Sequence, residues 1–364
     1  MSSPVGGAPM QRTRLSVQST HSKPLSLHRD GPGAAVRWGI VGCGWVARDH
    51  LLPGLRATPA ARLVGACDRD VVAAARLATG HDDVLATADL DALLSRPGLD
   101  AVYVATPNSA HLPVVARVAA RGIPVLCEKP LAADVDDAAA IVTACAGTLA
   151  GTAFDQRFHP AHRRIAEIVA AGELGTVTAV RIVYACWLPP DWSPDGAPND
   201  NWRVDPARAG GGALVDLAPH GIDLVGALLG DDLTELQVLL QRRVHAYPVD
   251  DGAVVDGRTA GEALFSAHVA FNTPDALPRR RLEVVGTRAQ LVAQDTMGQT
   301  AGGRLTRYDA DGAAVDVPFD TATSPFAAQR AAFSDAVAGT ADWPWPLERD
   351  LRLHRLLHSA IERS

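Results

Sequence analysis

The chain has 364 residues, of which 47% are hydrophobic and 21% charged, a size and composition typical of a globular protein with two domains. Its formal net charge of −7 argues against the concentrated basic surface that nucleic acid or an anionic membrane requires, so we expect neither partner. No apolar run approaches the roughly 20 residues of a membrane-spanning helix.

The cysteines and the N-terminal segment both bear on where the protein works. The five cysteines are an odd number, widely spaced and without a CxxC pair, which indicates free thiols in a reducing cytoplasm. Residues 1–35 are rich in Ser, Pro, Gly and Arg and lack the apolar core of a secretory signal, so we predict a disordered tail. A transit peptide and a start codon placed too far upstream are the alternatives for this segment.

The segment that follows carries the pattern of a dinucleotide-binding fold. An apolar run at residues 36–41 leads into a glycine-rich turn and a helical stretch that ends near residue 57, and a second apolar run occupies residues 63–67. Gly42 permits the tight turn, Gly44 lets the backbone approach a pyrophosphate, and the start of the helix presents unpaired N–H groups to it. The residues of this turn that we predict to bind the cofactor are Gly42, Gly44, Trp45, Val46 and Ala47.

An acid closes the second of these strands and bears on the choice of cofactor. At this position, the carboxylate of Asp68 would accept hydrogen bonds from the adenosine ribose hydroxyls and repel a 2′-phosphate. NAD is therefore the predicted cofactor. Arg69 stands beside this acid and could stack on adenine or tolerate the phosphate, which leaves NADP open as a second cofactor.

The alternation of strands and helices continues to about residue 157 and predicts a doubly wound parallel sheet. Residues 100–105 and 123–127 read as buried strands with a helical segment between them. Polar residues follow the first of these strands, at the edge where such sheets bind ligands. Helix capping is the alternative role for the asparagine and histidine of this group. The group that we predict to contact cofactor or substrate is Thr106, Pro107, Asn108 and His111.

Lys129 stands out because it is one of only two lysines among the 34 Lys and Arg residues of the chain. It follows the strand at 123–127 within the sequence Glu128-Lys129-Pro130, at the edge of the sheet where a nicotinamide would lie. An ammonium group can lose or relay a proton, whereas a guanidinium cannot. A solvated turn residue is the alternative. We predict that Glu128 and Lys129 contact the cofactor.

The chain after residue 157 has a different texture. Residues 176–184, 262–271, 282–285 and 289–292 read as strands without intervening helices. This pattern predicts an α+β domain with a mostly antiparallel sheet. The core would cover only one face of that sheet, because apolar and polar residues alternate along the second of these strands.

A glycine triplet at residues 210–212 opens a helical segment that carries two more candidates. Asp216 and His220 are spaced i, i+4 and therefore meet on one helix face. The glycines suggest close approach of the backbone to a ligand, so we favour a catalytic pair over a structural hydrogen bond. Asp216, His220 and Asp223 together do not form a recognised zinc spacing, and we predict no metal.

Together these motifs resemble the Gfo/Idh/MocA family of NAD(P)-dependent oxidoreductases, from residue 36 to the end of the chain. The resemblance rests on the GxGxxA turn, the Glu-Lys-Pro at a strand end and the GGG-x3-D-x3-H-x2-D block. It implies an N-terminal Rossmann domain at residues 36–157 and a C-terminal substrate-binding domain at residues 158–364, built on an open, mostly antiparallel sheet. It also implies homodimers or homotetramers formed through that sheet.

The resemblance assigns roles to individual residues as well. The family's catalytic lysine, aspartate and histidine fall on Lys129, Asp216 and His220. A histidine rather than a tyrosine at position 220 places the chain nearer to the inositol-dehydrogenase-like members. The family also implies a cis peptide bond before Pro130. The substrate contacts that it implies are Lys129, Arg157, Trp202, Arg203, Asp216 and His220.

The predicted activity is hydride transfer between NAD(P) and a secondary alcohol of a sugar, cyclitol or polyol. His220 would take the hydroxyl proton, Asp216 would orient the imidazole, and Lys129 would hydrogen-bond the reacting oxygen. The Trp- and Pro-rich segment 187–202 is expected to shape substrate choice, and the lack of a phosphate clamp outside the glycine turn favours an unphosphorylated substrate. Two alternatives stay open: a redox-neutral epimerase, lyase or glycosidase of the same fold, and a non-catalytic regulator that binds a dinucleotide or sugar.

Overall fold

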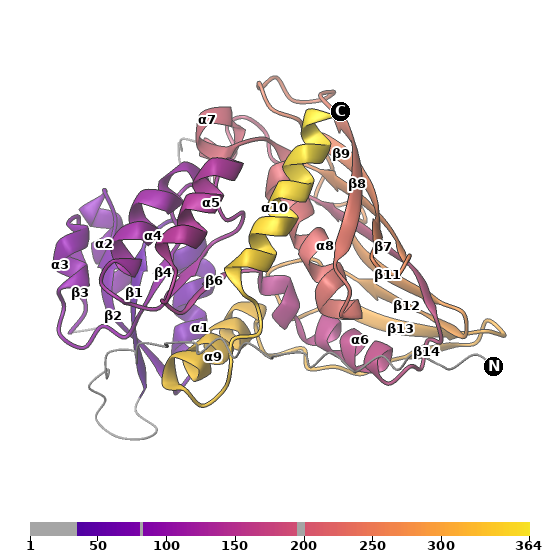
Figure 1. Cartoon of the computed structure of the whole chain (residues 1–364), viewed down its shortest axis with the longest axis horizontal. Helices are drawn as coiled ribbons and strands as arrows, with labels where there is room; N and C mark the ends of the chain where they lie inside the picture. The colour runs from indigo at the N-terminus through magenta and orange to yellow at the C-terminus, as the bar shows by residue number, and fades with distance from the viewer. Residues whose placement is uncertain (1–34, 81–82, 195–200) are drawn as a thin grey trace, which may run out of the picture.

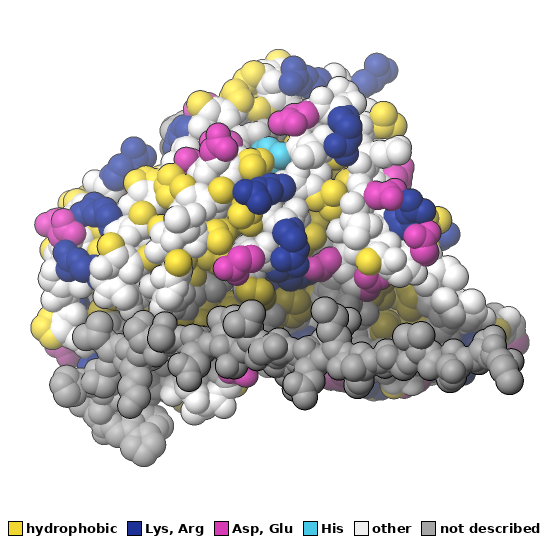
Figure 2. All heavy atoms as spheres, viewed as in Figure 1, with side chains coloured by type: hydrophobic (Ala, Val, Ile, Leu, Met, Phe, Trp, Pro, Cys, Tyr) yellow, Lys and Arg dark blue, Asp and Glu magenta, His cyan; other side chains and the backbone are white. Residues whose placement is uncertain are grey.

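The computed structural model describes residues 35–80, 83–194 and 201–364, so the predicted N-terminal tail lies, except for its last residue, outside the described residues. Two sheets lie side by side, with helices α8 (Ala213–Leu229) and α10 (Leu347–Glu362) between them (Figure 1). On the face shown in Figure 2, basic and acidic side chains are interspersed rather than segregated by sign.

The first sheet has six parallel strands in the order β3-β2-β1-β4-β5-β6, which confirms the predicted doubly wound arrangement. The strand order reverses between β1 and β4, and such a reversal opens a crevice at the carboxyl ends of the strands. The strands are β1 Val36–Val41, β2 Ala61–Cys67, β3 Leu85–Thr87, β4 Ala101–Val104, β5 Val125–Cys127 and β6 Ala150–Thr152. The connecting helices are η1 Ala47–Leu51, α1 Leu52–Arg56, α2 Val71–Ala78, α3 Leu90–Leu94, η2 Asn108–Ala110, α4 His111–Ala119 and α5 Val135–Ala144.

The second sheet has eight strands in the order β14-β13-β12-β11-β7-β10-β9-β8. Strands β7 and β10 run parallel and the other described pairs are antiparallel, which confirms the mostly antiparallel prediction. Strands β8, β9, β13 and β14 are not among those predicted from the sequence. The strands are β7 Val177–Ala185, β8 Leu233–Gln241, β9 Gly252–Thr259, β10 Leu264–Ala270, β11 Arg280–Gly286, β12 Ala289–Gln294, β13 Arg304–Asp309 and β14 Ala314–Asp316.

Helix α8 is the central helix of the second domain and continues through Pro219. The stretch Pro206–Leu229 is long and apolar enough to cross a membrane by length and composition, but 83% of its most apolar window is buried inside the protein, as in a core helix. The triple glycine before α8 brings protein backbones together, because a Cβ at Gly210 would overlap the Ala133 carbonyl and one at Gly212 the Asp250 carbonyl. The expected close approach is thus to protein rather than to a ligand.

The remaining helices belong to the second domain or connect it to the first. They are η3 Asp155–Phe158, α6 Pro160–Ala170, η4 Trp202–Val204, α7 Pro206–Ala209, α9 Pro325–Ala338 and α10. Phe326 and Phe333 of α9 lie in one core with Trp38 of the first sheet, and Leu347 and Leu351 of α10 also pack in the first domain. The predicted second domain, residues 158–364, therefore ends in two helices that also build the core of the first. All five cysteines are free, as expected.

Candidate active site

The glycine-rich turn after β1 has the shape that a dinucleotide needs. Gly42 has φ +92°, and a Cβ there would lie 2.5 Å from the backbone of Ala105, so only glycine fits. A Cβ at Gly44 would meet no atom within 4 Å, so this side of the turn is open for a pyrophosphate to approach. The Cys43 N–H donates to Asp68 Oδ2 at 2.7 Å, which ties the turn to the end of β2. The turn therefore fits the predicted cofactor.

Asp68 lies where a ribose would be bound, beside the turn. Each of its carboxylate oxygens accepts one backbone N–H, from Cys43 at 2.7 Å and from Asp70 at 2.9 Å. A carboxylate oxygen can accept a second hydrogen bond, so both retain capacity for ribose hydroxyls. Arg69 is exposed next to it. The preference for NAD over NADP stays a prediction.

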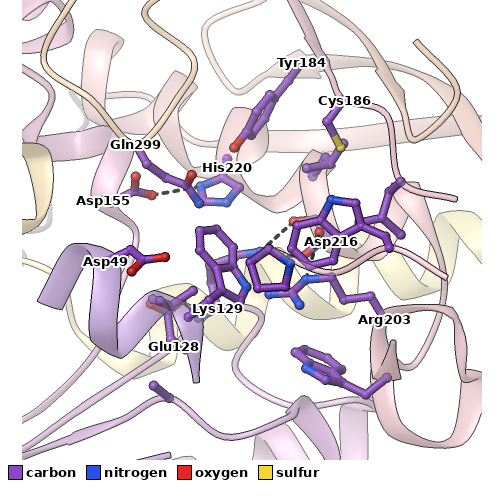
Figure 3. Close-up of a pocket in the computed structure, with 18 of the residues that line it drawn as sticks. Asp49, Glu128, Lys129, Asp155, Tyr184, Cys186, Arg203, Asp216, His220 and Gln299 are labelled. Atoms are coloured by element: carbon purple, nitrogen blue, oxygen red, sulfur yellow. Dashed lines mark hydrogen bonds and ion pairs between the residues drawn. The ribbon is translucent and has the colours of Figure 1, made fainter. Parts of the chain in front are cut away.

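A cleft of about 370 Å³ opens at the carboxyl edge of the first sheet and is closed on its other side by the second domain (Figure 3). It collects most of the predicted site residues from distant parts of the chain. It also contains residues that the sequence did not single out, among them Asp155, Tyr184 and Arg280. The predicted residues that line it are Trp45, Val46, Thr106, Asn108, Glu128, Lys129, Trp202, Arg203, Asp216 and His220.

Lys129 forms an ion pair with Asp216 across the two domains. Its Nζ donates to Asp216 Oδ1 at 2.7 Å and to the Asp216 carbonyl at 2.9 Å, and its peptide bond to Pro130 is cis, as the resemblance implied. Arg203 Nε lies 3.9 Å from the other carboxylate oxygen. Burial alone would raise the pKa of Asp216, but the charges of Lys129 and Arg203 hold it below its usual range. Asp216 is therefore an anion flanked by two cations.

The carboxylate partner of His220 is Asp155, which corrects the prediction that Asp216 would orient the imidazole. Asp155 Oδ1 lies 3.2 Å from His220 Nδ1, with both side chains almost fully buried. The contact is too bent to count as a hydrogen bond, so its attraction is mainly electrostatic. Burial alone would raise the pKa of Asp155, but the contact with His220 and the charge of Lys129 hold it below its usual range. Lys129 and His220 thus each lie beside a different carboxylate, Asp216 and Asp155 respectively.

Glu128 lines the cleft and is partly buried. It accepts a hydrogen bond from the Tyr103 hydroxyl at 2.8 Å and one from the Lys129 N–H at 3.2 Å. Loss of contact with water raises the pKa of Glu128 to about 7, although Lys129 and the Tyr103 hydroxyl partly offset the effect. The proton equilibrium of this side chain is therefore shifted toward neutral pH.

Three tryptophans surround the Arg203 guanidinium and form one wall of the cleft. Its carbon lies 4.6 Å from the ring centroid of Trp202 and 5.7 Å from those of Trp45 and Trp192. Trp45 and Trp192 meet edge to face with centroids 5.9 Å apart, so the glycine turn of the first domain contacts the second. The segment 187–202, expected to shape substrate choice, thus borders the cleft; its residues 195–200 lie outside the described residues.

Two predicted contacts have structural partners instead. Arg157 is buried and binds Asp223 through two hydrogen bonds, at 2.7 and 2.5 Å, and Asp350 at 2.8 Å. It does not line the cleft, whereas the resemblance implied that it contacts the substrate. The ring nitrogens of His111 lie 3.2 Å from the Leu131 carbonyl and 3.0 Å from the Thr106 carbonyl, and His111 is fully buried. Both side chains therefore make structural contacts within the protein.

Asn108 and Pro107 belong to the group that was predicted to contact cofactor or substrate. Asn108 lines the cleft, but its amide donates to the Ala209 carbonyl at 2.8 Å and so also fastens the edge of the sheet to α7. Pro107 precedes η2 and is not among the residues that line the cleft. Within residues 35–80, 83–194 and 201–364, no group of three His, Cys, Asp or Glu side chains is placed to hold a metal ion.

Comparison with known proteins places the chain in a family. Residues 36–150 match the family model described as "Oxidoreductase family, NAD-binding Rossmann fold", and residues 162–292 match the "GFO/IDH/MocA C-terminal domain". The chain is 31% identical to the 1,5-anhydro-D-fructose reductase of Ensifer adhaerens, over 83% of this chain and 88% of the relative. It is 32% identical to D-xylose 1-dehydrogenase (NADP(+)) 2 of Haloferax volcanii, over 82% and 88%.

Solved structures share the fold over nearly the whole chain. An oxidoreductase domain protein from Kribbella flavida superposes with a TM-score of 0.77 at 26% identity, over 91% of this chain and 98% of that one. A levoglucosan dehydrogenase in complex with NADH and L-sorbose shares the fold at 22% identity, with a TM-score of 0.76 over 90% and 96%. The chain therefore belongs to the Gfo/Idh/MocA family and is an NAD(P)-dependent oxidoreductase of the dehydrogenase and reductase type.

Proposed function

We propose that the protein interconverts a secondary alcohol and a ketone on a sugar or cyclitol, with NAD as the preferred cofactor. The observation that carries the proposal is the convergence of Lys129 and His220, each beside its own carboxylate, on one cleft at the carboxyl edge of a dinucleotide-binding sheet. The relatives described above include enzymes named for sugars, and an inositol 2-dehydrogenase of Saccharopolyspora erythraea is 28% identical over 65% of this chain and 67% of its own.

His220 is the proposed proton acceptor in the oxidation direction. A bound nicotinamide dinucleotide would supply the acceptor for the hydride that leaves the alcohol carbon. The hydroxyl proton passes to the imidazole, and Asp155 stabilises the positive charge that forms there. The alcohol thus loses one hydride and one proton and becomes a ketone, and the imidazolium returns the proton in the reverse reaction.

Lys129 is the proposed hydrogen-bond donor to the reacting oxygen. Asp216 fixes the ammonium group by accepting from it through both a carboxylate and a backbone oxygen, which leaves the third donor available for substrate. A donor held in place in this way stabilises negative charge that develops on the oxygen during the reaction. Arg203 and the surrounding tryptophans form the wall against which the apolar C–H face of a sugar ring would pack.

A dehydrogenase screen tests the proposal. Purified protein is assayed with a panel of cyclitols, neutral and charged sugars and sugar nucleotides, with NAD and NADP in parallel. We expect net NADH formation with at least one sugar or cyclitol, and a fall in turnover of about 10²- to 10⁴-fold in the separate variants Lys129→Ala and His220→Ala. Near wild-type turnover in both variants would show that the residues are assigned wrongly. Conversion of a substrate without net NADH formation would instead identify redox-neutral chemistry.

A further inference from the structure

Three arginines reach the cleft from two parts of the second domain, Arg203 from one and the neighbours Arg279 and Arg280 from the other, and they differ in what balances their charge. Arg203 lies near Asp216, and Arg279 Nη1 pairs with Asp275 Oδ1 at 2.7 Å, where Asp275 is 70% exposed. Within the described parts of the chain, no carboxylate lies at ion-pair distance from Arg280, and its buried Nε has no hydrogen-bond partner. Arg280 is therefore a cation that borders the cleft without an ion-pair partner among the described residues.

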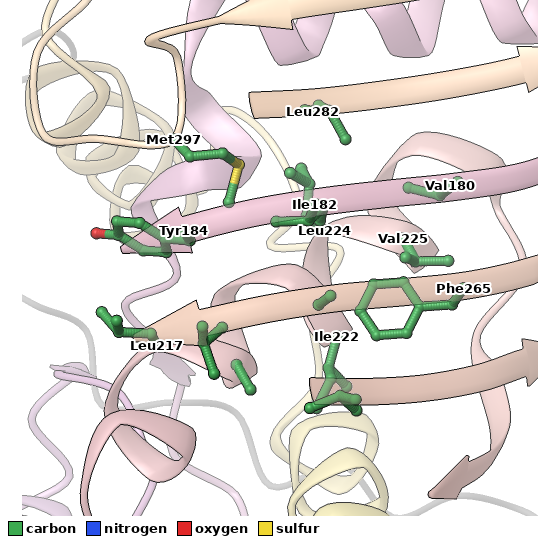
Figure 4. Packing of buried hydrophobic residues seen from close by; sticks show 14 of the residues in the cluster. Val180, Ile182, Tyr184, Leu217, Ile222, Leu224, Val225, Phe265, Leu282 and Met297 are labelled. Atoms are coloured by element: carbon green, nitrogen blue, oxygen red, sulfur yellow. The ribbon is translucent and has the colours of Figure 1, made fainter. Parts of the chain in front are cut away.

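The position of Arg280 relative to His220 is set by Tyr184. Tyr184 is the next-to-last residue of β7, and its hydroxyl points away from the core residues beside it (Figure 4). It pairs with Arg280 in the register of β7 and β11. The Arg280 guanidinium carbon lies 6.0 Å from the Tyr184 ring centroid, and the Tyr184 and His220 rings are 5.5 Å apart between centroids. Arg280 and His220, the proposed proton acceptor, therefore lie next to the same tyrosine ring and line the same cleft.

The loop after β12 holds the guanidinium in this place. A Cβ at Gly298 would overlap Arg280 Nη1, so the guanidinium packs directly against the backbone at this glycine. The Gly298 carbonyl accepts from Gln156 Nε2 at 2.9 Å, which ties the loop to η3 beside Asp155. Arg280 is consequently supported by a fixed part of the protein and not by a free loop.

The titratable neighbours of Arg280 do not supply the missing negative charge. Burial raises the pKa of the Cys186 thiol to about 12, and burial also raises the pKa of the Tyr184 hydroxyl well above its ordinary value. Both groups are therefore neutral near pH 7. A guanidinium binds carboxylate and phosphate groups through paired, charge-assisted hydrogen bonds, and such a group on a ligand would balance this charge.

We propose that the substrate carries an anionic group, a carboxylate or a phosphate, about one sugar ring away from the reacting carbon, and that Arg280 binds it with Arg279 at the mouth of the cleft. This inference rests on the proposed function, because it takes His220 as the reacting end. It narrows the substrate from sugars in general to acidic sugars. A carboxylate would agree with the unphosphorylated substrate that the sequence favoured, and a phosphate would not.

The experiment compares matched sugars in three proteins: wild type, Arg280→Gln and the control Arg281→Gln. Arg281 follows Arg280 on β11 but its side chain is exposed, pairs with Glu283 and does not line the cleft. The two substitutions therefore change the charge equally. D-glucose, D-glucuronate and D-glucose 6-phosphate are assayed with NAD, together with D-galactose and D-galacturonate. In parallel, each sugar is titrated into the NADH-loaded protein, and binding is followed by the fluorescence of the cleft tryptophans.

We expect wild type and Arg281→Gln to prefer the anionic member of each set in kcat/KM. Arg280→Gln should lower the ratio of anionic to neutral kcat/KM by about 10- to 100-fold, the effect of one charge-assisted hydrogen-bonded pair, and leave the neutral sugars little changed. The uronate and phosphate arms show which anion is bound. Equal loss for neutral and anionic sugars in Arg280→Gln, or the same ratio change in Arg281→Gln, would overturn the inference.

The two proposals fail in different ways. If neutral sugars turn over and charged ones are not preferred, the anion site is wrong and the dehydrogenase function stands. If no sugar turns over, the dehydrogenase function fails for these compounds, and the fluorescence titration decides the anion site alone. Binding without preference for the charged sugars would then overturn it, and tighter binding that is lost only in Arg280→Gln would support it.

Discussion

Replacing Asp155 by Asn tests whether this residue, and not Asp216, supports His220. The change keeps the size and shape of the side chain and removes its negative charge. Asp155 Oδ1 lies 3.2 Å from His220 Nδ1, with side-chain exposures of 4% and 7%. At an effective dielectric constant of about 20, two unit charges at this distance attract by about 5 kcal/mol. The cost of removing both groups from water offsets part of this attraction.

We take about half of this attraction, about 2–3 kcal/mol, as what remains after that offset. Asp155→Asn should therefore lower kcat by about 30- to 150-fold, because the imidazolium that forms in the oxidation direction loses its counter-charge. The assay is steady-state NADH formation with the best sugar from the screen. In a His220→Ala background the same change should cost little further turnover, because the group that Asp155 supports is absent there.

The parallel variant Asp216→Asn makes the comparison decisive. It should also slow turnover, because Lys129 loses its anchor, but it should keep most of its effect in the His220→Ala background. NADH binding and the far-ultraviolet circular dichroism spectrum serve as controls for the fold. If Asp155→Asn keeps its full effect in that background while Asp216→Asn loses its own effect there, then Asp216 is the imidazole's partner and the reasoning from the 3.2 Å contact is refuted.

Three further predictions concern other parts of the site. Lys129→Arg should keep NADH binding, measured by fluorescence, yet lose turnover by at least about 100-fold, because a planar guanidinium cannot reproduce the two bonds to Asp216; retained turnover would contradict this. Glu128 has its pKa raised to about 7, so the stability it contributes is present below about pH 4.5 and is lost as the pH rises through 7. Urea unfolding should therefore show Glu128→Gln gaining about 2–3 kcal/mol over wild type between pH 5 and pH 8, and a constant difference would be the opposing result. Asp223→Asn should lower the unfolding free energy by about 3–5 kcal/mol, because two buried arginines lose a carboxylate that both of them bind; the same change at exposed Asp316 should have no measurable effect, and equal effects would refute the argument.

The sequence was sufficient for the fold class and for those strands whose signals were local. The parallel strands appear as short, continuous apolar runs, each followed by a turn or helix, since both faces of that sheet are covered. The strands β8 and β9 lack such a signal. In β8, Leu239 is 73% exposed and Leu240 is 41% exposed, so the apolar residues do not mark a buried face in simple alternation. Packing against neighbours, and not periodicity, decides that this segment is a strand.

The site was predictable in position but not in pairing. The rule that ligands bind at the carboxyl ends of parallel strands brought Lys129 and Asn108 to the cleft. The same rule applies to Asp155, which follows the last parallel strand and could have been found in that way. The i, i+4 spacing of Asp216 and His220 showed only that they share a helix face. His220 and its carboxylate Asp155 are 65 positions apart in the chain, and Lys129 and Asp216 are 87 positions apart. Local spacing carries no information on pairs that are so distant in sequence.

The buried position of Arg157 follows from what the proposed chemistry requires of α8. Asp155 and Arg157 both belong to η3, while His220 and Asp223 both belong to α8. The Asp155–His220 contact and the bidentate Arg157–Asp223 pair therefore join the same two elements at two points, and two points prevent either element from rotating about the other.

The ion pairs that join η3 and α8 extend to the C-terminal helix α10. Asp223 also binds Arg349 at 2.5 Å, and Arg157 reaches Asp350 of the same helix at 2.8 Å. A displacement of a catalytic group by about 1 Å can lower the rate by about 10²-fold. A proton acceptor carried by one domain and supported from the other therefore needs contacts of this kind to fix its position. Arg157 therefore supports the site by holding η3 against α8 and not by contacting a ligand. Its closeness in sequence to Asp155, which lines the cleft, could not reveal this role.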